Sequence, residues 1–264
     1  MTLIMKQCME KIMDNTNKFT GKAKVYADSR PGYPKEFIEY LKTSAGLRGG
    51  SVAADIGSGT GKLSAELLKV CGKVVCVEPN DDMRLAAERA LGGSPGFVSV
   101  KATAENTTLA DKSVDVVTAA QSFHWFDADA FKRECKRILK PGGKAVLVWN
   151  SRDGRSPLVM ENAEICRRFC KDFKGFSGGI QDDTSKIYDF FGGRFEHIAI
   201  QCDIVFNKEK FILRALSASY SPTEDDAGYG EYIAALEDLF DKYSDNGLLV
   251  MPNILNSYMN TGEL

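Results

Sequence analysis

The chain has 264 residues, 44% of them apolar, which suits one large domain or one domain that carries a cap. Its formal net charge is -2 and it has no long basic run, so electrostatic capture of nucleic acid is not expected. The longest apolar stretches, such as residues 145–149, are too short to span a bilayer, and the first residues lack the apolar run of a signal peptide. We therefore expect a cytoplasmic protein that binds neither nucleic acid nor membranes.

Cysteine usage agrees with a reducing compartment. The seven cysteines are scattered, and none forms a CxxC pair. Cys166 and Cys170 stand one helical turn apart, but no histidine is close to them in sequence. Reduced thiols are therefore favoured over a zinc site, and no metal is expected.

A loosely ordered helix or tail is expected over residues 1–20, and apolar spacing predicts a helix over 34–41. From residue 51 onward, strands and helices alternate. We predict strands over 51–56, 73–77, 97–102, 113–119 and 145–149, and helices over 62–71, 82–91 and 128–139. This alternation implies a parallel sheet covered on both faces, whose ligands bind beyond the carboxyl ends of the strands.

The pattern is looser after residue 150. We predict helices over 157–171, 211–219 and 229–243, strands over 197–206 and 248–259, and a loop region with a short helix over 175–193.

The strongest chemical signal is the segment DIGSGTGK at residues 55–62, between a predicted strand and a predicted helix. Its glycines allow a sharp turn and let a ligand lie against the backbone. A nicotinamide fingerprint would need glycine or alanine at Lys62. A phosphate-binding P-loop would need a glycine at Ile56 and a hydroxyl residue at Leu63. Both phosphate-binding interpretations are weakened.

An acid follows the second predicted strand. In the segment VVCVEPN at residues 74–80, Glu78 follows the apolar run and lies 23 residues after Asp55, where an acid can accept hydrogen bonds from ribose hydroxyls. The alternative is a carboxylate that only favours the start of the next helix. We expect Glu78 to lie near solvent, so that its replacement barely changes folding.

These motifs resemble the class I S-adenosylmethionine-dependent methyltransferases, and more narrowly the branch of trans-aconitate methyltransferase-like proteins. The matching pieces are DIGSGTG, VEPNDDM, ATAENTTLADKSVDVVTAAQSFHWFD, RILKPGG, AVLVWN, YADSRPGYP and RALSASYSP. The resemblance implies a Rossmann-like, doubly wound α/β fold: a mostly parallel seven-stranded sheet with helices on both faces and a small cap. It also implies one methyltransferase domain over 1–264, with a lid in 1–50, the cofactor-binding core in 51–150, and a substrate-side cap with C-terminal strands in 151–264.

The resemblance further implies S-adenosylmethionine as cofactor and assigns residues to it. The glycine turn would wrap its amino-acid end, through Asp55, Gly57, Ser58, Gly59 and Gly61. Glu78 would hold the ribose, and the adenine would lie among Pro79, Met83, Ala104 and Glu105. Gln121 would lie where the methyl group points, followed on the acceptor side by Phe123, His124 and Trp125. Tyr26 and Arg30 either close over the cofactor or belong to a rigid turn set by prolines.

The acceptor is left open by these motifs. His124 is either a general base or a wall of the cavity, and Tyr33 and Arg152 are candidate acceptor-binding residues. The expected reaction is methyl transfer to a small molecule, with carboxylate O-methylation as one option, by a monomer or homodimer. The alternatives are a non-catalytic cofactor-binding or interaction protein and an NAD-dependent oxidoreductase, which Lys62 disfavours.

Overall fold

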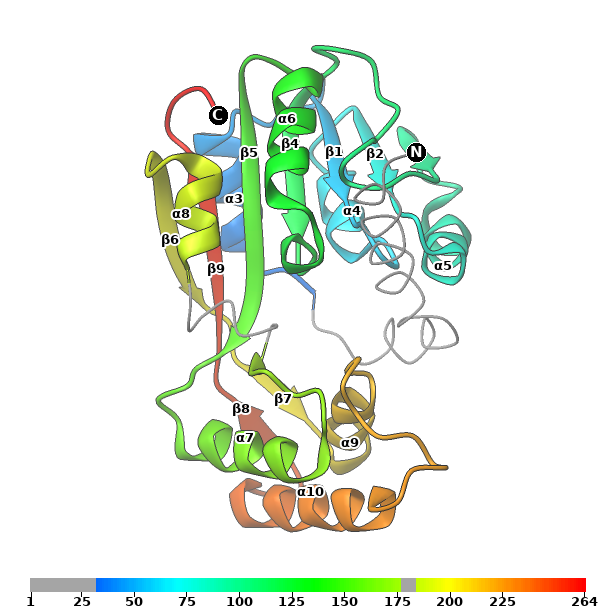
Figure 1. Ribbon diagram of the computed structural model, residues 1–264, viewed down its shortest axis with the longest axis vertical. Helices are drawn as coiled ribbons and strands as arrows, with labels where there is room; N and C mark the ends of the chain where they lie inside the picture. Colours follow the sequence, from blue (N-terminus) through cyan, green and yellow to red (C-terminus); the bar gives the residue numbers. More distant parts are fainter. Residues whose placement is uncertain (1–31, 177–183) are drawn as a thin grey trace, which may run out of the picture.

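The computed structural model describes residues 32–176 and 184–264 (Figure 1). Its main sheet has seven strands in the order β3-β2-β1-β4-β5-β9-β6. Neighbours from β3 to β5 pair in parallel, whereas β9 is antiparallel to both β5 and β6. The strands are β1 (Val52–Ile56), β2 (Lys73–Val77), β3 (Phe97–Val100), β4 (Val114–Ala120), β5 (Leu139–Arg152), β6 (Phe195–Gln201) and β9 (Asn253–Asn260). The predicted mostly parallel seven-stranded sheet is confirmed.

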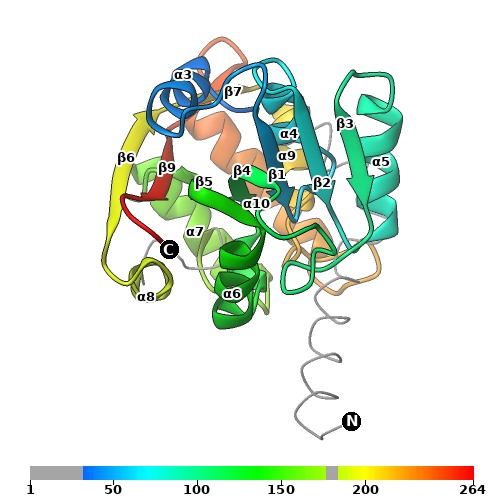
Figure 2. The same cartoon turned by 90° about the horizontal axis from the view of Figure 1, so that it is seen from above.

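Helices cover both faces of this sheet (Figure 2). α3 (Lys35–Ser44) and α4 (Lys62–Leu67) pack on one face, and α6 (Ala128–Ile138) and α8 (Ser185–Phe191) on the other. α5 (Asp81–Leu91) packs beside β3. Successive side chains of β1 point to opposite faces of the sheet. Ala53 packs beneath α3 and α4, and Ala54 packs beneath α6. This explains why β1 is an unbroken apolar run, since a strand buried on both faces needs apolar side chains at every position.

A small lobe lies beyond the carboxyl ends of the parallel strands (Figure 1). It consists of α7 (Pro157–Phe169), α9 (Lys208–Leu216), α10 (Tyr229–Tyr243) and a two-stranded sheet of β7 (Ile204–Phe206) and β8 (Leu249–Met251). Its apolar core is separate from the two cores of the main sheet and includes Phe211, Tyr232 and Phe240. The lobe is built from residues after 150, and its role as a substrate-side cap stays a prediction.

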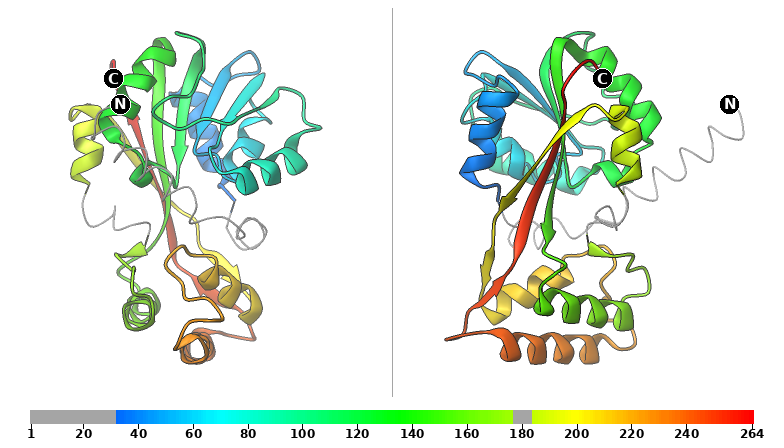
Figure 3. Two further views of the ribbon diagram at one scale, coloured as in Figure 1. Left: turned by 45° about the vertical axis from the view of Figure 1, so that its right-hand side comes forward. Right: turned by 90° about the vertical axis from the view of Figure 1, so that its left-hand side faces the viewer.

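Two predicted strands are each divided in the structure. Residues 197–206 form β6 and β7, and residues 248–259 form β8 and β9. Pro252 separates β8 from β9 because it has no N–H for the ladder. Cys202 and Asp203 separate β6 from β7, and the N–H of Cys202 donates to the carbonyl of Asn253 at 2.9 Å. The two segments therefore run side by side from the main sheet into the small lobe (Figure 3).

The fifth strand is longer than predicted. β5 runs over Leu139–Arg152 because β4 pairs with its first part and β9 pairs with its last part. The register places Arg152 opposite Asn253. The added length carries the chain from the main sheet to the small lobe. The predicted helix over 62–71 is shorter than expected, because α4 ends at Leu67.

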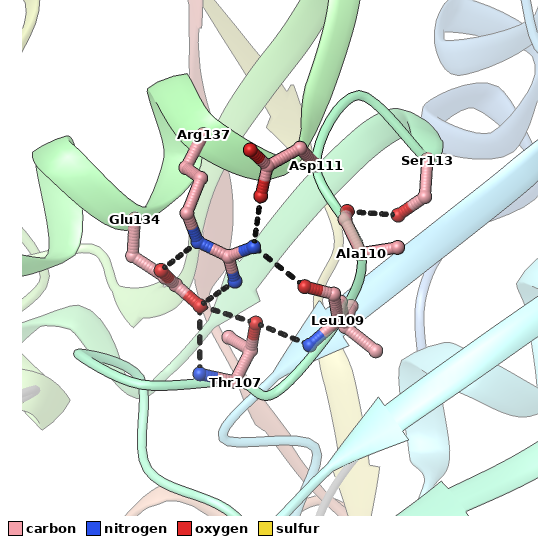
Figure 4. A network of polar contacts seen from close by, with 7 residues as sticks. All are labelled: Thr107, Leu109, Ala110, Asp111, Ser113, Glu134 and Arg137. Atoms are coloured by element: carbon pink, nitrogen blue, oxygen red, sulfur yellow. Dashed lines mark hydrogen bonds and ion pairs between the residues drawn. The ribbon is translucent and has the colours of Figure 1, made fainter.

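A polar network holds the loop between β3 and β4 against α6 (Figure 4). The buried Glu134 carboxylate accepts the N–H of Thr107 at 2.7 Å and a guanidinium N–H of Arg137 at 2.7 Å. Arg137 also donates to the carbonyl of Leu109 and to Asp111, each at 2.6 Å. Burial raises the pKa of Glu134, but the bonds from Arg137 and Thr107 outweigh it and leave this pKa lowered. These bonds anchor residues 107–111, which follow closely after Ala104 and Glu105.

Candidate functional site

The glycine turn, residues 57–61, follows β1 and has a backbone conformation that favours glycine. Gly57, Gly59 and Gly61 all have positive φ, at 65°, 56° and 80°. A Cβ on Gly57 would lie 2.6 Å from the Cβ of Ser122, whereas a Cβ on Gly59 would meet no atom of the described residues within 4 Å. The N–H of Gly57 donates to the carbonyl of Val77 at 2.8 Å, which ties the turn to the end of β2. The turn therefore has a closed side at Gly57 and an open side at Gly59.

Asp55 lies beneath this turn in the core. Its side chain is 1% exposed, and its two carboxylate oxygens accept the hydroxyls of Ser64 at 2.6 Å and Thr118 at 2.8 Å. These bonds join β1 to α4 and β4. Burial raises the pKa of Asp55 to about 6, and the two hydroxyls oppose this rise. The structure thus gives Asp55 a role in positioning the turn, and its contact with a cofactor stays a prediction.

Asp55→Asn is expected to change how stability depends on pH. The folded-state pKa of about 6 exceeds the ordinary value of 3.8, so the folded protein holds this proton more tightly than the unfolded chain does. Stability is therefore lost as the pH rises through this window. The difference corresponds to on the order of 3 kcal/mol.

Asparagine cannot ionise, so the variant should be more destabilised relative to wild type at about pH 4 than at about pH 7. Urea denaturation of both proteins at the two pH values measures this difference. The comparison cancels the contributions of other carboxyls, and parallel pH profiles for the two proteins would contradict the expectation.

Glu78 clamps the open side of the glycine turn. One carboxylate oxygen accepts the N–H of Gly59 at 2.9 Å and the other accepts the N–H of Asn80 at 2.9 Å. The residue is 8% exposed, so the expectation of a solvent-near side chain was wrong. Burial raises the pKa of Glu78, and the two N–H donors oppose that rise. The helix-start interpretation is also disfavoured, because Asn80 caps α5 by accepting the N–H of Met83 at 3.0 Å.

The residues expected around the adenine follow the two neighbouring strands β2 and β3. The N–H of Glu78 donates to the carbonyl of Val100 at 3.1 Å, so the ends of these strands lie together. Met83 and Ala104 are buried and Pro79 is partly exposed. Glu105 accepts the N–H of Asp127 at 3.1 Å. The structure brings these positions to one edge of the sheet, and their contact with adenine stays a prediction.

Gln121 has a strained backbone at the end of β4. Its φ is 59°, a left-handed conformation that is uncommon for a residue other than glycine. Its side-chain amide donates to the carbonyl of Asn150 at 3.0 Å. Such strain persists only where the surroundings impose it, and it concentrates at functional sites. No pattern in the sequence indicated this conformation, nor the packing of Ser122 against Gly57.

The segment after Gln121 divides between core and surface. Phe123 is 1% exposed and packs edge-to-face against Trp149 and Phe190. We therefore assign Phe123 to the core and withdraw it from the acceptor side. His124 and Trp125 are partly exposed, with ring centroids 4.8 Å apart in a short 3-10 helix.

The candidate residues before β1 are only partly described. Tyr26 and Arg30 lie outside the described residues. Tyr33 is half-buried, with its ring 6.0 Å from that of Phe37. The carbonyl of Gly32 accepts the side-chain amide of Asn150 at 3.3 Å, which places this segment beside the end of β5.

Arg152 lies at the end of β5, where the main sheet meets the small lobe. One guanidinium nitrogen donates to the amide oxygen of Asn162 at 2.7 Å, and the guanidinium lies 3.9 Å from the ring centre of Phe176. None of the ion pairs within residues 32–176 and 184–264 includes Arg152. Among the described residues, Arg152 is therefore not held in place by an ion pair with a surface acid.

The fold and the site define a class of protein. A seven-stranded sheet with one antiparallel strand inside its edge carries a glycine turn after β1 and a buried acid after β2. Residues 54–147 match the family model described as a methyltransferase domain. This segment, which holds the glycine turn and the acid after β2, therefore matches a methyltransferase domain.

Comparison with known proteins agrees with this class. An uncharacterized methyltransferase of Mycobacterium tuberculosis is 39% identical over 155 residues, which are 59% of this chain and 61% of the relative. The match thus spans about three fifths of that protein's length. An uncharacterized methyltransferase of Schizosaccharomyces pombe is 28% identical over 168 residues, covering 63% of this chain and 64% of the relative.

Solved structures show the same fold. A candidate type II methyltransferase from Anaeromyxobacter dehalogenans aligns with a TM-score of 0.58 and 22% identity, covering 89% of this chain and 97% of that one. A candidate methyltransferase of an antibiotic biosynthesis pathway from Anabaena variabilis aligns with a TM-score of 0.57 and 19% identity, over 85% and 97% of the two chains. Within the described ranges, no helix is long and apolar enough to cross a membrane.

Proposed function

We propose that this protein transfers the methyl group of S-adenosylmethionine to a small-molecule acceptor. The observation that carries the proposal is the clamp of Glu78 on the Gly59 N–H, at the side of the glycine turn where no atom of residues 32–176 or 184–264 would lie within 4 Å of an added Cβ. A carboxylate in this position can accept ribose hydroxyls, and the bare backbone lets a ligand approach closely. The resemblance to trans-aconitate methyltransferase-like proteins supports carboxylate O-methylation as the specific reaction.

The residues of the turn fit the amino-acid end of S-adenosylmethionine. The hydroxyls of Ser58 and Thr60 are buried and have no hydrogen-bond partner among the described residues. Buried hydroxyls are normally satisfied, so a polar group of a ligand is the fitting partner. Gly57 and Gly61 would shape the turn around that end of the molecule, and Glu78 would hold the ribose. Further assignments are Asp55 beneath the turn and Pro79, Met83, Ala104 and Glu105 around the adenine.

Bound S-adenosylmethionine supplies a methyl group on a positively charged sulfur. The protein's contribution is to align the acceptor with that methyl group and to exclude water. Gln121, fixed by its bond to Asn150, is proposed to border the methyl group, with His124, Trp125 and Tyr33 on the acceptor side. Tyr26 and Arg30 are proposed to cover the cofactor. A carboxylate acceptor needs no general base, whereas a hydroxyl acceptor would give His124 that role.

We also propose where the protein acts and on what. The scattered cysteines, none in a CxxC pair, support a cytoplasmic protein, and the net charge of -2 supports action on small molecules rather than on nucleic acid. We propose that residues 1–264 act as one methyltransferase domain, as a monomer or homodimer.

Calorimetry with S-adenosylmethionine, S-adenosylhomocysteine and NAD in parallel tests the function. We expect S-adenosylhomocysteine to bind in the micromolar range, about 8 kcal/mol, and NAD not to bind. Tight NAD binding without a response to S-adenosylhomocysteine would favour an oxidoreductase. Binding of S-adenosylhomocysteine without transfer of a radioactive methyl group to any metabolite extract would favour a non-catalytic cofactor-binding protein.

A further inference from the structure

The main sheet and the small lobe meet at a cluster of polar side chains. We define this junction cluster as Arg152 of β5, Asn162 of α7, Asn253 of β9 and Phe176. Arg152 donates to the amide oxygen of Asn162 at 2.7 Å, and its guanidinium lies 3.9 Å from the ring centre of Phe176. Asn253 is directly opposite Arg152 in the antiparallel ladder, so their side chains lie on the same face of the sheet. Arg152 is therefore flanked by two asparagines from different elements.

The two asparagines leave one donor and one acceptor unused. Asn162 is 1% exposed and Asn253 is 4% exposed. The amide nitrogen of Asn162, a donor, and the amide oxygen of Asn253, an acceptor, have no partner among the described residues. Buried polar atoms are normally hydrogen-bonded, and an unpaired one is costly. A group that fits this cluster must therefore accept a hydrogen bond on one side and donate one on the other.

A carboxamide meets this requirement and a carboxylate does not. A carboxylate has only acceptor oxygens, so it has no hydrogen to give to the Asn253 oxygen. A carboxamide carries an oxygen and an NH2 group on one carbon, so its oxygen can accept from Asn162 while its nitrogen donates to Asn253. The far end of the Arg152 side chain contacts Asn162, whereas Asn253 is opposite its backbone. Because the asparagines are separated along this side chain, a planar group with two polar atoms reaches both better than a single hydroxyl does.

The charge of Arg152 is balanced without an acidic ligand. Its guanidinium lies over the face of Phe176, which is a favourable cation–π contact. The residue is only partly buried, so its charge stays partly solvated. The neighbouring acid Asp153 pairs with Arg155 at 2.8 Å. A neutral ligand leaves these contacts as they are, and its carbonyl oxygen can accept a further guanidinium N–H of Arg152.

The position along β5 relates this cluster to the proposed methyl-transfer site. Gln121 donates to the carbonyl of Asn150, and Arg152 follows two residues later in the same strand. Two residues of a strand span about 7 Å. That distance fits a small molecule that is held at one end by the cluster and methylated at the other end, beside Gln121.

We propose that the junction cluster binds a carboxamide group of the methyl acceptor. Asn162 and Arg152 donate to its oxygen, and Asn253 accepts from its nitrogen. The carboxamide is the group by which the acceptor is held, and a different part of the same molecule receives the methyl group. This inference rests on the proposed function and names a chemical group by which its acceptor is recognised.

Thermal unfolding of the full chain tests the proposal. The probes are benzamide and succinamide, with benzoate and succinate as the matching acids and benzyl alcohol as a hydroxyl probe. All are measured at equal ionic strength, with and without saturating S-adenosylhomocysteine. At about ten times its dissociation constant, a bound amide should raise the unfolding temperature by about 3 °C. We expect at least one amide to do so in wild type, whereas the acids and the alcohol should not.

The variants separate binding from folding. Asn162→Asp keeps the oxygen that accepts from Arg152 and replaces only the unused NH2 group, so the variant should fold and lose the shift. Asn253→Leu removes an oxygen that has no described partner, so it should also fold and lose the shift. Asn256→Asp is the matched control, because Asn256 lies on the same strand β9 but contacts the exposed His197. This control should keep the shift.

Each outcome decides the proposal. An amide shift that persists in folded Asn162→Asp or in folded Asn253→Leu overturns carboxamide binding at this cluster. A wild-type protein that no amide stabilises overturns it, and so does one that benzoate, succinate or benzyl alcohol stabilises as much as the amides do. Failure of the proposed function is seen separately, as a wild-type protein that S-adenosylhomocysteine does not stabilise, whatever the amides do.

Discussion

Glu78→Ala is expected to weaken the binding of S-adenosylhomocysteine by more than tenfold. Two effects add in the same direction. The variant removes the carboxylate proposed to accept ribose hydroxyls, and it releases the Gly59 N–H that this carboxylate holds at 2.9 Å. Hydrogen bonds to a charged group contribute about 1.5–3 kcal/mol each, so one lost bond accounts for the tenfold change. Calorimetric titration of the folded variant measures the effect.

The buried position of Glu78 changes what its removal does to folding. Because the carboxylate also accepts the Asn80 N–H, alanine leaves two N–H donors without their acceptor, and some loss of stability is expected. Glu78→Gln keeps the size of the side chain and separates lost charge from lost packing. Glu88→Gln is the matched control, since Glu88 is paired with Arg84 on α5 and has no proposed cofactor role. Undiminished affinity in both Glu78 variants would show that this acid does not touch the cofactor.

Gly57→Val is expected to abolish S-adenosylhomocysteine binding. The residue has φ of 65°, which is strongly unfavourable for a β-branched side chain. Its Cβ would also lie 2.6 Å from the Cβ of Ser122 and 3.1 Å from the ring of Phe126. The turn must therefore move away from β4 and from the edge where Glu78 holds it. Isothermal titration after confirming the fold by circular dichroism measures the loss.

The other glycines act as graded controls for this result. Gly59→Val should also abolish binding, through its φ of 56° and through intrusion into the ligand's space, because no atom in the described part of the chain lies within 4 Å of the added Cβ. Gly142→Ala combines a φ of 78° with open surroundings far from the turn in sequence, so it reports the backbone cost alone. That cost is about 1–2 kcal/mol. Normal binding by a folded Gly57→Val protein would mean that the turn does not contact the cofactor.

Local sequence patterns determined most of the fold. The bounds predicted for residues 73–77 and 229–243 are those of β2 and α10. A continuous apolar run predicts the strand and a long amphipathic repeat predicts the helix, and both patterns can be recognised within a short stretch of sequence. The glycine turn and the acid after the second strand were visible for the same reason. Positive φ at Gly57, Gly59 and Gly61 is a property of the backbone that only glycine permits without strain.

Tertiary structure alone decided how those pieces act on one another. Glu78 was expected near solvent because a strand end is usually exposed. In the structure it is buried and accepts the N–H groups of Gly59 and Asn80. Phe123 carried an aromatic signal that fits a binding site equally well, and its burial against Trp149 and Phe190 placed it in the core. Neither outcome follows from residue type or spacing, because each depends on which side of a fold the neighbours occupy.

Arg152 shows the limit of sequence-based prediction most clearly. Arg152 was recognisable from the sequence only as a cation after the fifth strand. Its contact with Asn162 and its place opposite Asn253 join residues 10 and 101 positions apart. The alternation of strands and helices determined the class of fold and the edge where the cofactor is expected, since those signals are local. The partners of Arg152 were decided by strand register and by the packing of the small lobe, since long-range contacts leave no local pattern in a single sequence.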